Sequence, residues 1–304
     1  MSSQETTPLL SDRPDLPLHV GPTRVHDAAP ISARVCRSAW PWLGQRALVF
    51  VRGGILTYLT ALLPLLVRNK VVGNTAGGQT PWGVMFDFST IAHVLQWLWH
   101  LVSFVMIFNL SPPDEPESSS KHFYPSLLYT AAHVFNFINT AMYWAVLVPQ
   151  GHGNFPNGGA PGTGWLQPLS VANMYGVTSL IASSEVMFLN TIKHQHAVSN
   201  HVLSTMFLLA GYLGWAAIGN TMTGHYPIFW MDPKEMGSAG LVAAYAAGFV
   251  AMGPAMFAAL YGLTSLREKL AKYASRSEGY SRIHDSDDEH AQSQRTGDQR
   301  GSRA

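Results

Sequence analysis

Charge is scarce in this chain of 304 residues: lysine, arginine, aspartate and glutamate make up 12% of it, against roughly 25% in soluble globular domains. The scarcity is concentrated in residues 47–266, which hold only six lysines and arginines. A soluble surface needs more charge than this, whereas a surface facing lipid excludes it. The composition therefore argues against a soluble enzyme and against a nucleic-acid-binding protein, and we expect no nucleic-acid partner.

Cysteine is almost absent as well, since Cys36 is the only one in the sequence. One cysteine cannot form an intrachain disulfide, which excludes a secreted scaffold held together by such bonds. Cys36 lies about ten residues before the first long apolar stretch. A palmitoyl chain could be attached at this position, although an unmodified thiol is equally compatible with it.

Six apolar stretches are each close to or above the ~20 residues that a helix needs to cross a bilayer. They are residues 47–67, 82–109, 123–149, 168–190, 200–220 and 238–266. None of them alternates polar and apolar residues with the period of two that a spanning strand requires. The sequence therefore predicts an all-α fold, a transmembrane bundle of about six helices over residues 47–266 whose partners are membrane lipids.

Polar segments flank this domain, and we expect both tails, residues 1–46 and 267–304, to be disordered. Arginine and lysine cluster in the parts of both tails that lie next to the spans, whereas residues 150–167 contain neither. Because lysine and arginine are enriched in cytoplasmic segments, both tails are predicted to lie in the cytoplasm.

In the first tail, Glu5 precedes the pair Leu9 and Leu10 by four residues. This spacing resembles the acidic dileucine signals that adaptor complexes bind on cargo for lysosomes or vacuoles. A chance match in a polar segment is the alternative. The pattern predicts binding to an adaptor complex and a location in an endomembrane, vacuolar or lysosomal.

Two of the predicted spans carry polar residues along one helical face. In residues 82–109 these are Ser89, His93, Gln96 and His100, and in residues 123–149 they are Tyr129, His133, Asn136 and Thr140. Polar groups in hydrocarbon are costly without partners, so we expect the two stripes to face a common interior.

A hydroxyl beside an imidazole at one depth is the minimum arrangement for nucleophilic attack assisted by a general base. Ser89, Thr90, His93 and His133 are therefore the candidate catalytic residues. Hydroxyls and histidines also join transmembrane helices through ordinary hydrogen bonds, and composition alone favours that packing role.

Other polar residues of the spans have simpler interpretations. Arg52 and Glu185 fall at one depth, and we expect a structural ion pair rather than a proton or ion relay. Glycines in the last span predict a surface for close helix packing; they are Gly248, Gly253 and Gly262.

The turn after the fourth span is rich in histidine, at His194, His196 and His201, but it has no cysteine or acidic residue. A zinc site usually draws on such ligands, so we expect a solvated turn and predict neither a metal nor a cofactor.

Four short runs occur in a fixed order between residues 82 and 266. They are Trp82-Gly-Val-Met-Phe-Asp-Phe-Ser-Thr90 leading into His93-Val-Leu-Gln96, then Asn136-Phe-Ile-Asn139, then Tyr175-Gly176-Val177-Thr178-Ser179, and last Gly211-Tyr-Leu-Gly-Trp215 through Thr223-Gly224-His225-Tyr226-Pro227-Ile-Phe229. In order and placement these runs resemble the androgen-induced protein and Rolling stone family of multi-pass membrane proteins.

The resemblance implies an intramembrane hydrolase of fatty acid esters of hydroxy fatty acids, acting through a threonine and a histidine. The threonine position falls on Ser89 or Thr90. The histidine belongs to a run that reads Tyr175-Gly176-Val177-Thr178 here and contains no histidine. Either His133 or His93 replaces it, or the chain has kept the fold without the activity.

Three functions are therefore compatible with the sequence. The first is a lipid-ester hydrolase, with a lipid ester as its substrate. The second is a non-catalytic membrane protein that binds lipid or a partner. The third, a small-solute transporter, has the least support, because no pair of broken helices is evident.

Overall fold

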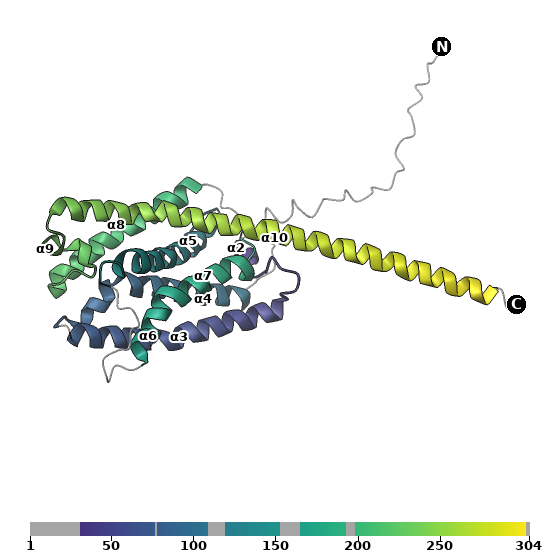
Figure 1. Ribbon diagram of the computed structural model, residues 1–304, viewed down its shortest axis with the longest axis horizontal. Coiled ribbons are helices and arrows are strands. Elements are labelled where there is room, and N and C mark those ends of the chain that lie inside the picture. Colours follow the sequence, from purple (N-terminus) through teal and green to yellow (C-terminus); the bar gives the residue numbers. More distant parts are fainter. Residues whose placement is uncertain (1–30, 77, 109–118, 153–164, 193–197, 302–304) are drawn as a thin grey trace, which may run out of the picture. The chain divides into compact units, whose positions relative to one another are not determined.

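The computed structural model describes residues 31–76, 78–108, 119–152, 165–192 and 198–301, and all regular secondary structure in these ranges is helical (Figure 1). The predicted all-α class is therefore confirmed. In chain order the elements are α2 (Ile31–Val35), α3 (Gln45–Ala76), η1 (Pro81–Phe86), α4 (Phe88–Phe108), α5 (Ser119–Met142), η2 (Tyr143–Leu147), α6 (Leu166–Ala172), η3 (Asn173–Val177), α7 (Thr178–Ser184), η4 (Glu185–Leu189), α8 (Val198–Thr223), η5 (Phe229–Met231), α9 (Pro233–Met236) and α10 (Ala239–Gly301). Of the short elements, η1 and η5 are 3₁₀ helices, whereas η2, η3 and η4 are π-helical.

Among the described residues, four helices are long and apolar enough to cross a membrane, as expected of an integral membrane protein. They are Gln45–Thr75, Phe88–Phe108, Val198–Thr223 and Ala239–Ala274. These four coincide with the first, second, fifth and sixth apolar stretches of the sequence. The third and fourth stretches correspond to α5 and to the consecutive elements from α6 to η4, which are more polar.

Helix α5 occupies the centre of the packing, because it contacts α4, α7, α8 and α10. Helix α3 packs on α4, and α8 runs beside α10 (Figure 1). The ring of Phe88 on α4 joins three of these helices, with centroids 5.3 Å from Phe135 on α5, 4.9 Å from Tyr212 on α8 and 5.1 Å from Phe249 on α10. Edge-on and tilted aromatic pairs of this kind add stability beyond the area that they bury.

Close packing of α10 on α8 depends on one of the three predicted glycines. A Cβ atom at Gly253 would lie 2.9 Å from Cδ1 of Leu209, so a larger residue would force the Leu209 side chain to shift. The other two, Gly248 and Gly262, would have no atom within 4 Å of an added Cβ. The predicted packing surface is therefore confirmed at Gly253, and it is wrong at Gly248 and Gly262.

Helical structure extends past both limits predicted for the transmembrane domain. Helix α2 lies inside the expected first tail, and Val35 and Cys36 are buried. Helix α10 continues beyond residue 266, and Arg267 is also buried. The helices that the structure describes therefore begin before residue 47 and extend past residue 266, while Glu5, Leu9 and Leu10 lie outside the described residues.

Candidate functional site

The polar stripes of α4 and α5 face the interior, as predicted. Six of their members are no more than 2% exposed: Ser89, His93, Gln96, His100, His133 and Asn136. Asn136 Nδ2 donates to the Ala92 carbonyl of α4 at 3.1 Å, and Thr140 Oγ1 lies 2.5 Å from Oγ of Ser179 on α7. The stripes thus join α5 to the helices on either side of it.

The helix that runs from α6 to η4 contains two π-helical turns: η3 interrupts it, and η4 ends it. A π-turn widens a helix and frees carbonyl oxygens from their usual partners, and such turns are frequent at functional sites. Neighbouring helices supply donors for these oxygens: Asn139 Nδ2 lies 2.7 Å from the Met174 oxygen, and Gln96 Nε2 lies 2.7 Å from the Thr178 oxygen. The turn η3, which carries Tyr175, is therefore fixed in place by side chains of α4 and α5.

An acidic residue caps the start of α4. Asp87 has an extended backbone (φ −77°, ψ 127°), and its carbonyl accepts the first helical hydrogen bond, from the Ile91 N–H at 3.1 Å. Its Oδ2 accepts hydrogen bonds from Ser89 Oγ at 2.7 Å and from Thr90 Oγ1 at 3.1 Å. The positive end of the helix dipole favours a carboxylate at this position. Because Asp87 accepts a hydrogen bond from each, it holds both candidate hydroxyls in one place.

Two further helices complete a polar cluster around Ser89. Lys70, near the end of α3, forms an ion pair with Asp87, and its Nζ donates to Ser89 Oγ at 2.5 Å. From η3, the Tyr175 hydroxyl donates to the same Oγ at 3.4 Å. A serine hydroxyl therefore contacts a carboxylate, an amine and a phenol, which are a proton acceptor and two hydrogen-bond donors.

Two cavities, of about 540 and about 480 Å³, border this cluster. Both are lined by Asp87 and Tyr175, the first also by Lys70 and the second also by Ser89. The volumes lie in the range of small-molecule sites, which is roughly 300–1,000 Å³. His225 and its two successors line both cavities as well, so every sequence run quoted for the family resemblance contributes to one or both walls.

Ser89 and Thr90 lie together, as predicted, through their shared acceptor Asp87. His93 lies one turn further along α4 and is buried beside the backbone of Leu59 on α3. No side chain in the described part of the chain hydrogen-bonds to its ring. His93 is therefore near the hydroxyls in sequence but is not joined to them.

His133 lies at a different depth from the candidate hydroxyls. Its ring centroid is 4.3 Å from that of Tyr129 and 6.2 Å from that of Trp99, and its Nδ1 lies 2.6 Å from the Tyr129 carbonyl oxygen. Trp99 follows Ser89 by ten residues on α4, which corresponds to about 15 Å along the helix. The structure therefore does not bring His133 to Ser89 or Thr90.

Sequence reasoning missed the partners that Ser89 does have. Tyr175 occupies the first position of the run in which the family resemblance implies a histidine. This position was the one feature of the sequence that could have indicated Tyr175 as a partner of Ser89. Asp87 stands directly before the first residue of α4, and aspartate at the start of a helix often accepts hydrogen bonds from the residues that follow it. Nothing in the sequence pointed to Lys70, because it reaches Ser89 only through the packing of α3 against η1 and α4.

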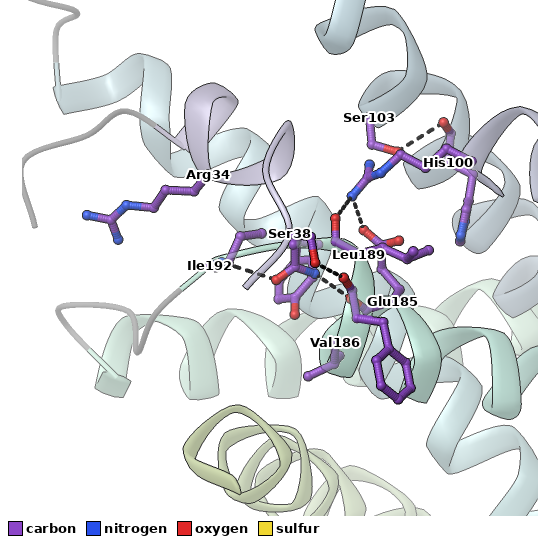
Figure 2. A network of polar contacts seen from close by, with 12 residues as sticks. Arg34, Ser38, His100, Ser103, Glu185, Val186, Leu189 and Ile192 are labelled. Atoms are coloured by element: carbon purple, nitrogen blue, oxygen red, sulfur yellow. Dashed lines mark hydrogen bonds and ion pairs between the residues drawn. The ribbon is translucent and has the colours of Figure 1, made fainter. Parts of the chain in front are cut away.

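The other end of the bundle contains the predicted ion pair between Arg52 and Glu185, which is confirmed. Arg52 Nη2 lies 2.6 Å from Glu185 Oε1, and both side chains are completely buried. The same nitrogen donates to the Leu189 carbonyl at 2.7 Å, and Figure 2 shows this carbonyl beside the Glu185 carboxylate. Arg52 therefore pairs with the first residue of η4 and caps the last.

A second arginine binds the chain that follows η4. Arg267 Nη1 donates to Asn190 Oδ1 at 2.7 Å and to the Val186 carbonyl at 3.0 Å, while Nη2 donates to the Ile192 carbonyl at 2.5 Å. Helix ends leave carbonyls without intrahelical partners, and cations are favoured there. The role of both arginines is structural, since each one satisfies the end of the π-helical segment.

Within the described ranges, no group of three or more histidine, cysteine, aspartate or glutamate side chains is arranged to hold a metal ion. His201 is buried near Ser126 on α5, with its Nε2 3.5 Å from that hydroxyl. His194 and His196 lie outside the described residues.

No family model, curated protein or solved structure matches this chain. The fold and the site together define a helical protein with apolar spans and a polar cluster beside two cavities at one end of its bundle.

Proposed function

We propose that this protein hydrolyses lipid esters within the membrane, with Ser89 as the nucleophile. The observation that carries the proposal is the set of contacts at one oxygen: Ser89 Oγ donates to Asp87 and accepts from Lys70 and Tyr175 at the wall of a cavity. A nucleophilic hydroxyl needs an acceptor for its proton, and the oxygen of the carbonyl that it attacks needs donors for the charge that develops there. Asp87 is the acceptor, and Lys70 and Tyr175 are the donors next to the nucleophile.

In the first step, Ser89 Oγ forms a bond to the acyl carbon of the ester while Asp87 Oδ2 accepts the hydroxyl proton, and the π electron pair of the carbonyl moves to its oxygen. The resulting oxyanion re-forms the carbonyl as the bond to the alcohol oxygen breaks, and Asp87 returns the proton to the departing alkoxide. The products of this step are a free alcohol and an acyl group on Ser89.

In the second step, a water molecule gives one proton to Asp87 while its oxygen bonds to the acyl carbon. Cleavage of the bond to Oγ releases the fatty acid, and the proton held by Asp87 restores the Ser89 hydroxyl. Lys70 and Tyr175 remain hydrogen-bond donors throughout and stabilise the negative charge on the carbonyl oxygen, which lies next to Oγ in the tetrahedral intermediate.

The family resemblance supports the same assignment. Its nucleophile position falls on Ser89 or Thr90, and its histidine run begins at Tyr175, whose hydroxyl approaches Ser89. We propose membership of the androgen-induced protein and Rolling stone family, in a form that uses Tyr175, Asp87 and Lys70 in place of the histidine.

We further propose six spans rather than four. Helix α5 has 24 residues, and the helix from α6 to η4 extends from Leu166 to Leu189, so each is long enough to cross ~30 Å of hydrocarbon. Both pack against membrane-spanning helices. Their polar side chains face those neighbours, which explains why they are less apolar as a whole.

For the location of the protein, we propose an endomembrane, vacuolar or lysosomal. The support is the acidic dileucine pattern at Glu5, Leu9 and Leu10 in the predicted cytoplasmic tail.

The direct test is labelling of the purified, membrane-reconstituted protein by a fluorophosphonate, together with hydrolysis of a fluorogenic long-chain ester. Ser89→Ala should abolish both. The matched control is Ser103→Ala, because Ser103 is a buried serine of the same helix whose hydroxyl bonds to the His100 carbonyl of its own turn. This control should retain both activities.

Three results would each count against the assignment. Labelling that survives Ser89→Ala but is lost in Thr90→Ala would move the nucleophile to Thr90. Labelling lost equally in the Ser89 and Ser103 variants would indicate damage to the fold rather than loss of a nucleophile. A folded protein that neither reacts nor hydrolyses would favour the non-catalytic lipid-binding function.

A further inference from the structure

A third cavity, of about 600 Å³, lies between α5, α7 and α10, and its lining is largely apolar. Leu180 and Leu266 at its edge are 67% and 47% exposed, so the cavity is a groove that opens at the side of the bundle. In a membrane this side faces hydrocarbon. The residues that shape the groove are Phe137, Leu180, Met256, Ala259, Gly262 and Leu266.

Two of the three helices that form this groove, α5 and α10, also line the cavity at Ser89, with Met142 and Phe249. The third side of that cavity is formed by Tyr175 of η3, the turn that leads into α7. The groove begins with Thr140 on α5 and with Ser179, one turn after Tyr175. The groove therefore lies next to the Ser89 cavity along α5 and α10, further towards the other end of the bundle.

Depth along α10 relates the groove to the nucleophile. The ring of Phe249 lies 5.1 Å from that of Phe88, the residue next to Ser89. Met256 and Leu266 follow Phe249 by seven and seventeen residues in the same helix, which correspond to about 10 and about 26 Å. A lipid chain spans about half of the ~30 Å hydrocarbon core, so one that is attached at Ser89 reaches the groove with its far end.

Small residues of α10 keep the groove open. Ala259 and Gly262 form part of its wall, and a Cβ atom added at Gly262 would have nothing within 4 Å. A bulky side chain at Gly262 would therefore extend into the groove without an immediate clash, and Ala259 is an exposed residue of the same wall.

We propose that this groove binds the far half of the acyl chain of the ester that is cleaved at Ser89, and that it makes the site selective for long chains. The inference rests on the proposed hydrolase function. A short acyl group ends before it reaches Met256, so its hydrolysis does not depend on the groove.

The test compares Ala259→Leu and Gly262→Leu with Ala258→Leu. Ala258 is exposed on the same turn of α10 and does not line the groove, so it controls for the larger side chain. For the two groove variants, kcat/KM should fall about tenfold with a palmitoyl ester and stay unchanged with a butanoyl ester of the same alcohol, because several methylene contacts are lost. Ala258→Leu should behave as the unchanged protein with both esters. Equal losses with both esters, or a loss in Ala258→Leu of the same size, would overturn the proposal.

A second measurement separates the groove from the hydrolase. Palmitic acid with a diazirine near its terminal methyl is added to vesicles that contain each variant and is activated by light. Peptides from residues 256–266 should carry less label in Ala259→Leu and Gly262→Leu than in Ala258→Leu. Equal labelling in all variants would reject the groove even if the ester is cleaved. Reduced labelling in a protein that cleaves no ester would keep the acyl-chain site and reject the hydrolase.

Discussion

Arg52 and Glu185 form an ion pair 2.6 Å long in which neither side chain has any exposed surface. Two charges removed from water are stable only if each satisfies the other, and removal of one leaves the second uncompensated. Arg52 has a further partner in the Leu189 carbonyl, whereas the second Glu185 oxygen has no hydrogen-bond partner within the described structure. The two residues are therefore not equivalent.

Glu185→Gln should lower the free energy of unfolding by about 3–5 kcal/mol, because Arg52 keeps its charge without the carboxylate. The double variant Arg52→Met with Glu185→Leu should recover part of this loss. It should remain less stable by about 1–3 kcal/mol, because the buried Leu189 carbonyl loses its donor. Denaturant or thermal unfolding in detergent measures Glu185→Gln, the double variant, and its two components Arg52→Met and Glu185→Leu alone. If the double variant loses the sum of the two single losses, the residues are not coupled.

The number of spans can be tested with a glycosylation acceptor inserted near Gly158. With six spans, the segment between α5 and α6 lies opposite the cytoplasm and the acceptor is modified. With only the four most apolar helices spanning, the whole segment from α4 to α8 stays on the cytoplasmic side and no sugar is added.

Tags at residues 1 and 304 should be digested by protease added to vesicles of cytosolic orientation, because both models place the two tails in the cytoplasm. Protection of one tag alone would reject both models.

Cys36 should be an unreactive thiol. Its side chain is 2% exposed, and burial raises the thiol pKa above its ordinary value, against the opposing effect of Arg52 and Arg37. A raised pKa leaves less thiolate at pH 8, so iodoacetamide should modify the folded protein much more slowly than the unfolded one. Mass spectrometry of the alkylated protein measures this rate, and Cys36→Ser is the blank. Rapid alkylation of folded protein, or a palmitoyl group found on Cys36 in cells, would contradict the expectation.

The sorting pattern makes a separate prediction. Replacing Leu9 and Leu10 by alanine should shift the protein from vacuolar or lysosomal membranes to the cell surface, because an adaptor complex would no longer bind the tail. Fluorescence microscopy of the tagged protein measures the shift, and Thr6 and Thr7 replaced by alanine serve as the control. If the distribution does not change, the dileucine pattern is a chance match.

The sequence predicted those features that depend on local periodicity. The stripe of Ser89 and Gln96 repeats with the helical period, and its burial followed from the cost of polar groups in hydrocarbon. The contact of Lys70 with Ser89 has no local signature, because it depends on where α3 ends relative to α4. The prediction for His133 relied only on its expected depth in the membrane. In the structure, the position of α5 along α4 depends on hydrogen bonds such as that from Asn136 to the Ala92 carbonyl, which the sequence does not reveal.

The choice of partner for Ser89 can be decided by kinetics. The sequence favours His133 or His93 as the base, whereas the structure brings Asp87, Lys70 and Tyr175 to the hydroxyl. Lys70→Met should lower kcat by about a hundredfold or more, because it removes the cation beside Ser89 that would stabilise the carbonyl oxyanion. Tyr175→Phe should have a smaller effect, since its hydrogen bond is long at 3.4 Å. His133→Ala should lower the melting temperature through lost contacts with Trp99 and leave kcat unchanged. A folded His133→Ala variant without activity, beside an active Lys70→Met variant, would restore the histidine as the base.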